Sequence, residues 1–366
     1  MSVKANETSA PAKRRKAARS NANSSGGNGA RSINLALQGG GAHGAFTCGV
    51  LDRLLEDERI AIEAISGTSA GAMNAVALAD GFEKGGREGA REALHRFWRA
   101  ASEGACFSLI QRTPWDQWAG NWSLNTSPGY LALDMLTRLA SPYELNPFNL
   151  NPLKDFLARQ IDFDTVRCCG QIKLFVSATS VRTGRARIFR NAELSPDAVM
   201  ASACLPNMFQ AVEIDGEAFW DGGYMGNPAL HPFIYRCATR DIVIVQINPI
   251  DSPHTPKRAR DILDRINEIN FNSSLLAELR AIEFVTRLLD DGQLDPKRYK
   301  RMLIHRIDGE AELTPLDASS KVNAEWVFLE ALHGMGYRAA SKWLARHFDE
   351  LGETSSVNLR SMFAGA

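Results

Sequence analysis

The sequence lacks three features that would point to particular classes of protein. It carries no net charge, because 42 basic side chains balance 42 acidic ones across 366 residues, and this balance argues against a nucleic-acid partner. It has no apolar run of the roughly 18 residues that a membrane-spanning helix needs. Its six cysteines include no C-x-x-C spacing, which argues against a zinc site and a disulfide framework. We therefore predict a globular protein with mostly buried thiols.

Positive charge is nevertheless concentrated in the first 31 residues. That segment has seven basic residues against one acidic residue, and it is rich in Ser, Asn, Gly and Ala without an apolar run. Such a composition cannot bury enough surface to fold, so residues 1–31 are predicted to be a disordered basic tail. The tail is either a solubilising leader or a contact for anionic lipid headgroups. Because no secretory h-region follows the charges, we expect a cytoplasmic protein, with peripheral membrane contact as an open alternative.

Strands and helices alternate after the tail. Residues 33–38 alternate in polarity like a strand, reach a glycine cluster at 39–44, and lead into a helix whose apolar positions recur at three- and four-residue steps. The same order repeats with a strand at 62–66, a tight turn at 67–71 and a small-residue helix at 72–79. This alternation predicts an α/β fold with a largely parallel central sheet flanked by helices.

Residues 104–152 interrupt that alternation. They bring Trp115, Trp118 and Trp122 close together and contain five prolines, which prevent any long helix. We predict an insertion above the edge of the sheet. Its tryptophans either pack within the protein or present an apolar surface.

Regular structure is predicted to return after the insertion. Two hairpins are expected, at 173–189 and at 212–220, and Asp215-Gly216 is the turn of the second. The apolar run 241–248 is typical of a strand buried on both faces, and a late strand is expected at 302–307 among helices. We therefore divide the chain into a tail, an α/β domain and a mainly helical C-terminal extension: residues 1–31, 32–250 and 251–366.

The turn at 67–71 carries a G-x-S-x-G pattern between a predicted strand and a predicted helix. A serine on such a turn has its hydroxyl thrust out of a strained bend, and Gly67 and Gly71 remove the side chains that would collide there. The N-terminus of the helix adds potential that favours negative charge. The pattern predicts Ser69 as a nucleophile; a capped helix start with small residues is the structural alternative.

Gly39, Gly40 and Gly41 supply a second part of such a site. Consecutive glycines let backbone N–H groups approach a substrate closely, as stabilising the oxyanion of acyl transfer requires. A phosphate site would use the same arrangement, and a G-x-G-x-x-G dinucleotide pattern fits Gly39, Gly41 and Gly44. No clear acidic residue follows where that pattern needs one, because the next strand ends in the turn of Ser69. We therefore predict an oxyanion hole.

Asp221 supplies a third part. It ends an aromatic strand and is followed by two glycines, so its carboxylate can reach a ligand without steric cover. Asp215 lies between two alternating runs and fits the hairpin turn better. We assign Asp215 to the turn and Asp221 to the role of general base.

With these parts in this order, the sequence resembles the patatin-like phospholipases, a family of lipid acyl hydrolases that use a Ser-Asp dyad. The resemblance spans residues 33–248. It rests on the glycine loop, the G-x-S-x-G turn, the D-G-G motif and an Ala-Ser-containing block that ends in proline: residues 39–44, 67–71, 221–223 and 201–206. It implies a patatin-like fold of three layers.

The resemblance also implies a mechanism without metal or other cofactor. Asp221 takes the proton of Ser69, which attacks a lipid ester as in a phospholipase A, a lysophospholipase or an esterase, and the loop amides hold the oxyanion. A carboxylate with a pKa near 4 is a weak base, so the dyad requires a shielded pocket. The tryptophans of the insertion are then candidates for an acyl-chain wall or a bilayer contact.

Two positions depart from the family pattern. Gln38 stands where the family has an acid before the glycines, and His43 stands where it has an arginine. The backbone donors depend on neither side chain, so the oxyanion assignment is kept, and the role of His43 is left open.

Three other functions are open. A Ser-His-Asp hydrolase would use one of the later histidines as its base: His231, His254, His305, His333 or His347. A catalytically idle, lipid-associated scaffold would keep the fold without the chemistry. A nucleotide-binding protein would use the glycine loop for phosphate.

Overall fold

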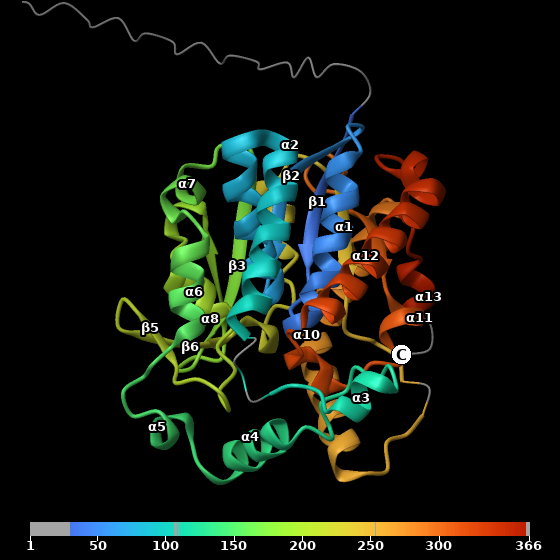
Figure 1. Cartoon of the computed structure of the whole chain (residues 1–366). Coiled ribbons are helices and arrows are strands. Elements are labelled where there is room, and N and C mark those ends of the chain that lie inside the picture. Colours follow the sequence, from blue (N-terminus) through green and yellow to red (C-terminus); the bar gives the residue numbers. More distant parts are fainter. Residues whose placement is uncertain (1–29, 106–107, 109, 253, 364–366) are drawn as a thin grey trace, which may run out of the picture.

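The structure is a computed structural model, and it describes residues 30–105, 108, 110–252 and 254–363 (Figure 1). Residues 1–29 of the predicted tail lie outside the described residues. The first strand, β1 (Arg31–Leu37), begins two residues earlier than the sequence indicates. Arg31 and Ser32 join the sheet because they pair with Ile60 and Ala61 of the neighbouring strand.

A mixed sheet of eight strands forms the middle layer. The remaining strands are β2 (Ile60–Gly67), β3 (Lys173–Ser180), β4 (Ala186–Arg190), β5 (Val212–Ile214), β6 (Glu217–Asp221), β7 (Asp241–Gln246) and β8 (Leu303–Asp308). Their order is β5-β6-β3-β2-β1-β7-β8, with β4 also paired to β3. From β3 to β8 the neighbours along this path are parallel, whereas β4, β5 and β6 pair antiparallel. The predicted, largely parallel sheet is confirmed.

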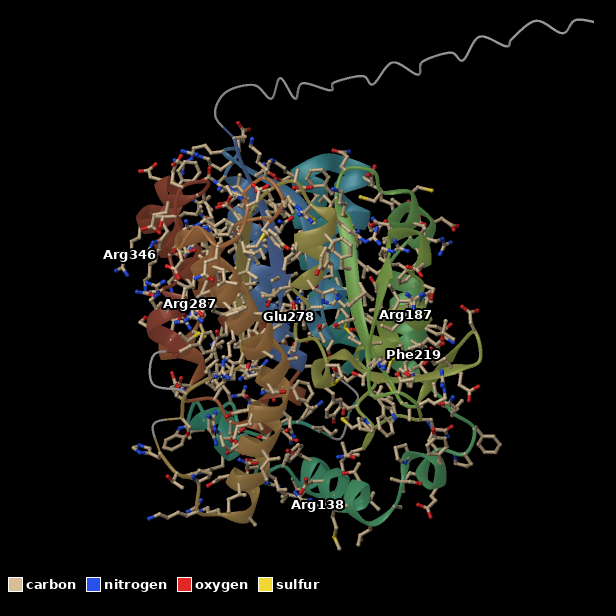
Figure 2. All side chains as sticks on the ribbon, turned by 180° about the vertical axis from the view of Figure 1, so that it is seen from behind. Arg138, Arg187, Phe219, Glu278, Arg287 and Arg346 are labelled. Atoms are coloured by element: carbon tan, nitrogen blue, oxygen red, sulfur yellow. The ribbon has the colours of Figure 1, made fainter. Side chains whose placement is uncertain are left out.

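Helices cover both faces of the sheet. In Figure 1, α1 (Gly44–Glu56), α2 (Ala70–Ala105) and α12 (Trp326–His347) lie in front, and Figure 2 shows α10 (Ala259–Asp290) on the opposite face. A hydrophobic core lies on each face of the sheet, and alternate residues of β1 pack into the two cores. Leu35 and Leu37 pack toward α1, and Ala36 packs toward α10. This period of two buries the strand on both sides. The three-layer fold is confirmed.

The remaining helices are short. They are α3 (Pro114–Trp118), α4 (Pro128–Leu139), α5 (Pro142–Leu145), α6 (Pro152–Gln160), α7 (Phe163–Cys168), α8 (Pro196–Ser202), α9 (His231–Arg236), α11 (Glu310–Leu313) and α13 (Leu359–Phe363), with 3-10 turns η1 (Gly41–His43), η2 (Asn191–Glu193), η3 (Gly222–Tyr224), η4 (Ala318–Val322) and η5 (Phe348–Glu350). Figure 1 places α3, α4 and α5, which belong to the predicted insertion, below the sheet, at the carboxyl ends of the parallel strands.

One predicted helix is much shorter than the observed one. The helix expected over 72–79 continues as α2 to Ala105, across a break at Gly85 and Gly86 where the backbone leaves helical angles. The second half remains a helix because Leu94 and Phe97 bury one face against the core.

The later elements match the sequence pattern. Both hairpins form, and β7 is buried along its whole length. The late strand β8 pairs in parallel with β7, and α12 packs on α1 in the same core as the residues before 250. The domain boundary at residue 250 stays a prediction. Among the described residues, no helix is long and apolar enough to cross a bilayer.

Candidate active site

Strand pairing brings the glycine loop and the serine turn together. β1 and β2 are parallel neighbours, and their last residues, Leu37 and Gly67, face each other in register. The loops that follow them therefore leave the same edge of the sheet, where α/β proteins bind ligands. A Cβ atom on Gly39 would lie 2.8 Å from Cβ of Ser69, so only glycine lets the loop come this close.

Ser69 occupies a strained turn. Its φ of 52° lies in the left-handed region that side chains other than glycine rarely adopt, and α2 begins at the next residue. Its backbone amide donates to Oγ of Ser202 at 2.9 Å, which ties the turn to α8. Gly71 packs directly on β1, because a Cβ atom there would lie 2.3 Å from the carbonyl oxygen of Leu37. This geometry resembles a nucleophile elbow, with the Ser69 side chain half-buried rather than sealed.

Asp221 lies at the end of β6 and is almost completely buried, with 1% of its surface exposed. Oδ1 of its carboxylate accepts the amide of Gly223 at 2.7 Å, and the side chain of Ser69 lies close enough to lower the pKa of the carboxyl. Its own amide donates to the carbonyl of Cys204 at 2.8 Å, which connects the D-G-G motif to the block at 201–206. The side chains of Ser69 and Asp221 are thus brought together.

Burial dominates the electrostatics of Asp221. It raises the pKa of the carboxyl from 3.8 to about 7, because a charged carboxylate loses its hydration in the interior. The hydrogen bond from the Gly223 amide and the nearby Ser69 hydroxyl oppose this rise by stabilising the charged form. The shielded environment that a carboxylate base requires is therefore present.

The predicted oxyanion loop is held from both sides. The amide of Gly39 donates to Oδ1 of Asn227 at 2.7 Å, and its carbonyl accepts Nδ2 of Asn248 at 2.7 Å. Gly40 precedes the short turn η1, and Gly41 has a φ of 58° with the carbonyl of Lys321 close against it. The Gly39 amide is thus already engaged by a side chain in this arrangement.

The hydrogen bonds of Gln38 explain why an amide stands where the family pattern has an acid. Its Oε1 accepts the amides of Ile247 and Asn248, each at 2.9 Å, and its Nε2 donates to Oδ1 of Asn272 at 3.1 Å. The residue is fully buried. A carboxylate could accept the first two hydrogen bonds but could not donate the third, so the amide suits this position better than an acid.

His43 points into the protein interior. Its Nε2 lies 2.8 Å from Oγ of Ser320, in η4. Burial, helped by the charge of Lys321, lowers the pKa of His43 to about 3, so the ring is neutral at physiological pH. These contacts link the glycine loop to the C-terminal part of the chain.

Five of the other six histidines have side-chain partners away from Ser69. Carboxylates contact four of them, in the pairs His231–Glu278, His305–Asp241, His333–Asp52 and His347–Glu350. His254 is exposed, and His95 stacks edge-on against Trp326. All seven histidines fall within the described residues, and none of them hydrogen-bonds to Ser69 there. No described group of three or more His, Cys, Asp or Glu side chains is arranged to hold a metal ion.

Sequence reasoning missed the residues that hold the loop and the turn. These are Ser202, Asn227, Asn248 and Lys321. Ser202 and Asn227 lie inside or close to quoted motifs, which is a usable signal. Asn248 ends the apolar run of β7, whereas Lys321 lies in a region without any motif.

Comparison with known proteins identifies one family. A family model described as patatin-like phospholipase matches residues 35–234, which is more than half of the chain. Among solved structures, the crystal structure of VipD from Legionella pneumophila is similar, at 15% identity over 84% of this chain and 67% of that chain, with a TM-score of 0.35. No curated protein matches.

Proposed function

The chain belongs to the patatin-like phospholipase family, and from this premise we propose that it hydrolyses ester bonds of lipids with Ser69 as nucleophile and Asp221 as general base. The observation that carries the proposal is the meeting of these two side chains at one end of the sheet. Ser69 is half-buried on a strained turn, and its side chain lies close enough to the buried Asp221 carboxylate to stabilise the charged form.

The reaction proceeds through an acyl-enzyme. Asp221 removes the proton of the Ser69 hydroxyl as its oxygen attacks the ester carbonyl carbon, which gives a tetrahedral oxyanion. The carbon–oxygen bond to the leaving alcohol then breaks, and the alcohol takes the proton from Asp221. A water molecule, deprotonated by Asp221, attacks the acyl-enzyme, and the fatty acid leaves as Ser69 recovers its proton.

The glycine loop is proposed to stabilise the oxyanion through the amides of Gly39, Gly40 and Gly41. Because the Gly39 amide donates to Asn227, the amides of Gly40 and Gly41 are the readier donors. Asn227 and Asn248 then act as positioning residues, since they hold Gly39 against the serine turn.

The substrate class that this chemistry fits is a lipid ester with an apolar acyl chain. We propose action in the cytoplasm, at the surface of membranes, because such substrates reside in bilayers. The basic tail would add attraction to anionic headgroups.

A lipid panel tests the function. Purified full-length protein is incubated with phospholipids labelled on either acyl chain, with a lysophospholipid and with a neutral glyceride, and fatty acid release is measured. We expect release by the wild type and by Ser273→Ala, which changes an exposed serine of α10, and a loss on the order of a thousandfold or more in Ser69→Ala. Activity that survives Ser69→Ala would contradict the proposal.

A histidine scan separates the dyad from a Ser-His-Asp mechanism. Asp221→Asn should abolish hydrolysis, and alanine at His231, His254, His305, His333 or His347 should leave the chemical step intact in folded protein. An active Asp221→Asn together with an inactive histidine variant would assign the base to that histidine.

A further inference from the structure

The insertion exposes an unusual amount of apolar surface. Of the twenty large hydrophobic side chains that are exposed in the described part of the chain, ten lie between Trp115 and Leu150. Isolated exposed hydrophobics are ordinary, but a gathering of this kind marks an interaction surface. We call these ten residues the apolar face: Trp115, Trp118, Leu131, Met135, Leu136, Leu139, Tyr143, Leu145, Phe148 and Leu150.

Helix α4 is oriented with its polar side inward. Arg260 of α10 forms an ion pair with Asp134 at 3.3 Å and lies over the ring of Tyr130, so polar contacts attach α4 to the body. Its apolar residues point outward, with Met135 63% and Leu139 71% exposed, and no residue of α4 is buried. A surface helix of a soluble protein normally does the opposite. The apolar side of α4 is therefore available to bind something outside the chain.

The neighbouring α3 also exposes apolar side chains, and hydrogen bonds hold it in place. Trp115 and Trp118 stack on each other with ring centroids 5.0 Å apart, yet both are more than 70% exposed. Between them, the buried Asp116 accepts hydrogen bonds from Asn121 and from the hydroxyls of Thr113 and Thr126. These hydrogen bonds fix the helix, so the exposure of the tryptophans is built into the fold.

The apolar face adjoins the candidate active site. The side-chain Nε2 of Gln210 donates to the carbonyl of Asn146 at 2.6 Å, and the backbone amide of Ala211 donates to the hydroxyl of Tyr143 at 3.2 Å. The segment that includes Gln210 follows the block at 201–206, which contacts the amides of both Ser69 and Asp221. Figures 1 and 2 show α3 and α4 at the end of the molecule where the parallel strands stop, with Arg138 of α4 at its lower edge.

Helix α10 continues this surface toward the dyad. Ile262, Ile266 and Ile269 follow one another at four- and three-residue steps and are 40% to 52% exposed. Two residues further on, the ring of Phe271 packs against Gly223, whose amide binds Asp221. The nine residue-to-residue steps from Ile262 to Phe271 span about 14 Å of helix, a distance comparable with much of an acyl chain.

We propose that the apolar face docks on a lipid bilayer by inserting its tryptophans and the outer side of α4, so that lipid esters reach Ser69 along α10. This inference rests on the proposed function, because it takes the docking surface to be the one that delivers the substrate.

The charges favour a bilayer held by insertion rather than by electrostatic attraction. Between residues 114 and 150 the charged residues are Asp116, which is buried, the ion pair of Asp134 with Arg138, and Glu144. A surface with so little net charge gains little from anionic headgroups. Tryptophan, by contrast, is favoured at the interface between hydrocarbon and water. An amphipathic helix binds a membrane in proportion to the apolar area it buries.

Vesicle binding tests the proposal without requiring turnover. Full-length Ser69→Ala protein is sedimented with sucrose-loaded phosphatidylcholine vesicles in 0.1 M and 1 M NaCl. We expect binding that persists at the higher salt concentration, with a blue shift of tryptophan fluorescence. Adding Met135→Glu and Leu139→Glu should weaken binding at least about tenfold, and so should Trp115→Ala with Trp118→Ala.

A matched variant controls for apolar surface elsewhere. Tyr235 is 80% and Phe284 is 51% exposed outside the apolar face, so Tyr235→Glu with Phe284→Glu should bind vesicles like the parent protein. Equal binding by the apolar-face variants and this control would overturn the inference. So would a dimer in sedimentation velocity that Leu139→Glu dissociates, since a second copy would then cover the face.

Hydrolysis of a water-soluble monomeric ester separates this inference from the proposed function. In a chain with intact Ser69, the apolar-face variants should hydrolyse that ester at the wild-type rate and lose at least about tenfold on vesicle lipid. A wild-type chain that hydrolyses no ester would defeat the proposed function alone. Variants that act normally on vesicle lipid would defeat the docking inference alone.

Discussion

At the scale of single residues, the chemistry depends on how deeply Asp221 is buried. An exposed aspartate holds its proton too weakly to act as an effective base at neutral pH. Burial raises the pKa of Asp221 to about 7, which is close to the ideal for general base catalysis at neutral pH. The Gly223 amide and the Ser69 hydroxyl keep the charged form accessible, because both stabilise the carboxylate.

The pH dependence of hydrolysis follows from this pKa. Only the ionised carboxylate can accept the Ser69 proton, so kcat/KM for a soluble ester should rise about tenfold per pH unit below pH 7 and level off above it. Initial rates between pH 5 and pH 9 provide the measurement. A profile that is flat from pH 5 upward would show that the base has an ordinary carboxyl pKa.

The raised pKa of Asp221 also means that its ionised carboxylate destabilises the folded protein. Its folded-state pKa lies above the unfolded value, so its contribution is most favourable below pH 3.8 and is lost as pH rises through about 7. Asp221→Asn should therefore be more stable than the wild type at pH 8, by on the order of 4 kcal/mol, and so unfold at a higher temperature, with little difference at pH 4. Thermal unfolding at both pH values is the test. A lower Tm for the variant at pH 8 would refute the burial argument.

Sequence reasoning reached the residue identities but not their environment. Ser69 and Asp221 were predicted from local patterns, and the structure brings their side chains together, while their catalytic roles stay a proposal. The partners of the glycine loop were missed because Asn227 and Asn248 follow Gly39 by about two hundred residues and reach it only through the sheet. Hydrogen bonds over such separations leave no local pattern.

At the scale of elements, the glycine loop is a strand-to-helix connection held by its surroundings. Asn248 connects the glycine loop to Lys321, since its Nδ2 donates to the Gly39 carbonyl while its Oδ1 accepts a hydrogen bond from Nζ of Lys321 at 2.8 Å. Through Lys321 and Ser320, η4 contacts the loop, and Ser319 of the same turn accepts the amide of Leu124 in the insertion at 2.8 Å. The oxyanion loop and the insertion thus share one support.

Removing Asn248 should disturb catalysis more than binding. Asn248→Ala leaves the Gly39 carbonyl and the Lys321 ammonium without this partner, so the loop amides lose their alignment, and we expect kcat to fall about tenfold to a hundredfold with a smaller change in KM. The control is Asn34→Ala, a buried asparagine that donates to the carbonyl of Thr239. Steady-state kinetics on a soluble ester distinguishes the two. Equal kcat values for Asn248→Ala and Asn34→Ala would show that Asn248 does not position the glycine loop.

The elements that the sequence predicted well are those defined by local chemistry. Asp215 and Gly216 both adopt positive φ in the second hairpin, as a two-residue turn demands. The prolines of the insertion were instead interpreted only as interruptions. Four of them begin helices, each after a capping side chain, in the pairs Thr113-Pro114, Ser127-Pro128, Ser141-Pro142 and Asn151-Pro152. Proline suits the first helical position because that residue has no intrahelical amide bond to lose.

At the scale of the whole molecule, the residues after 250 complete the core. α12 packs on α1, and the two helices meet closely at glycines: a Cβ atom on Gly336 would lie 1.9 Å from the carbonyl oxygen of Phe46. β8 extends the parallel sheet beyond β7. The periodicity of a helix indicates that it buries one face, but it does not indicate which helix it buries that face against, so this packing could not be predicted.

A small substitution tests how firmly α12 is integrated. Gly336→Ala forces α1 and α12 apart and should lower the Tm by at least about 3 °C, together with the yield of active protein. Gly334→Ala, two residues earlier, meets only the flexible end of Arg338 at 3.3 Å and should be nearly neutral. Thermal unfolding of both full-length variants is compared. Similar Tm values for the two would contradict the close helix contact.

The most direct test of the central claim is to map where a fluorophosphonate attaches. Such probes form a covalent bond with an activated serine, so peptide mass spectrometry identifies the nucleophile without any assumption about the natural lipid. A single adduct on Ser69, greatly slowed in Asp221→Asn, is the predicted result. An adduct on another serine, or labelling of Ser69 at an unchanged rate without Asp221, would contradict the account.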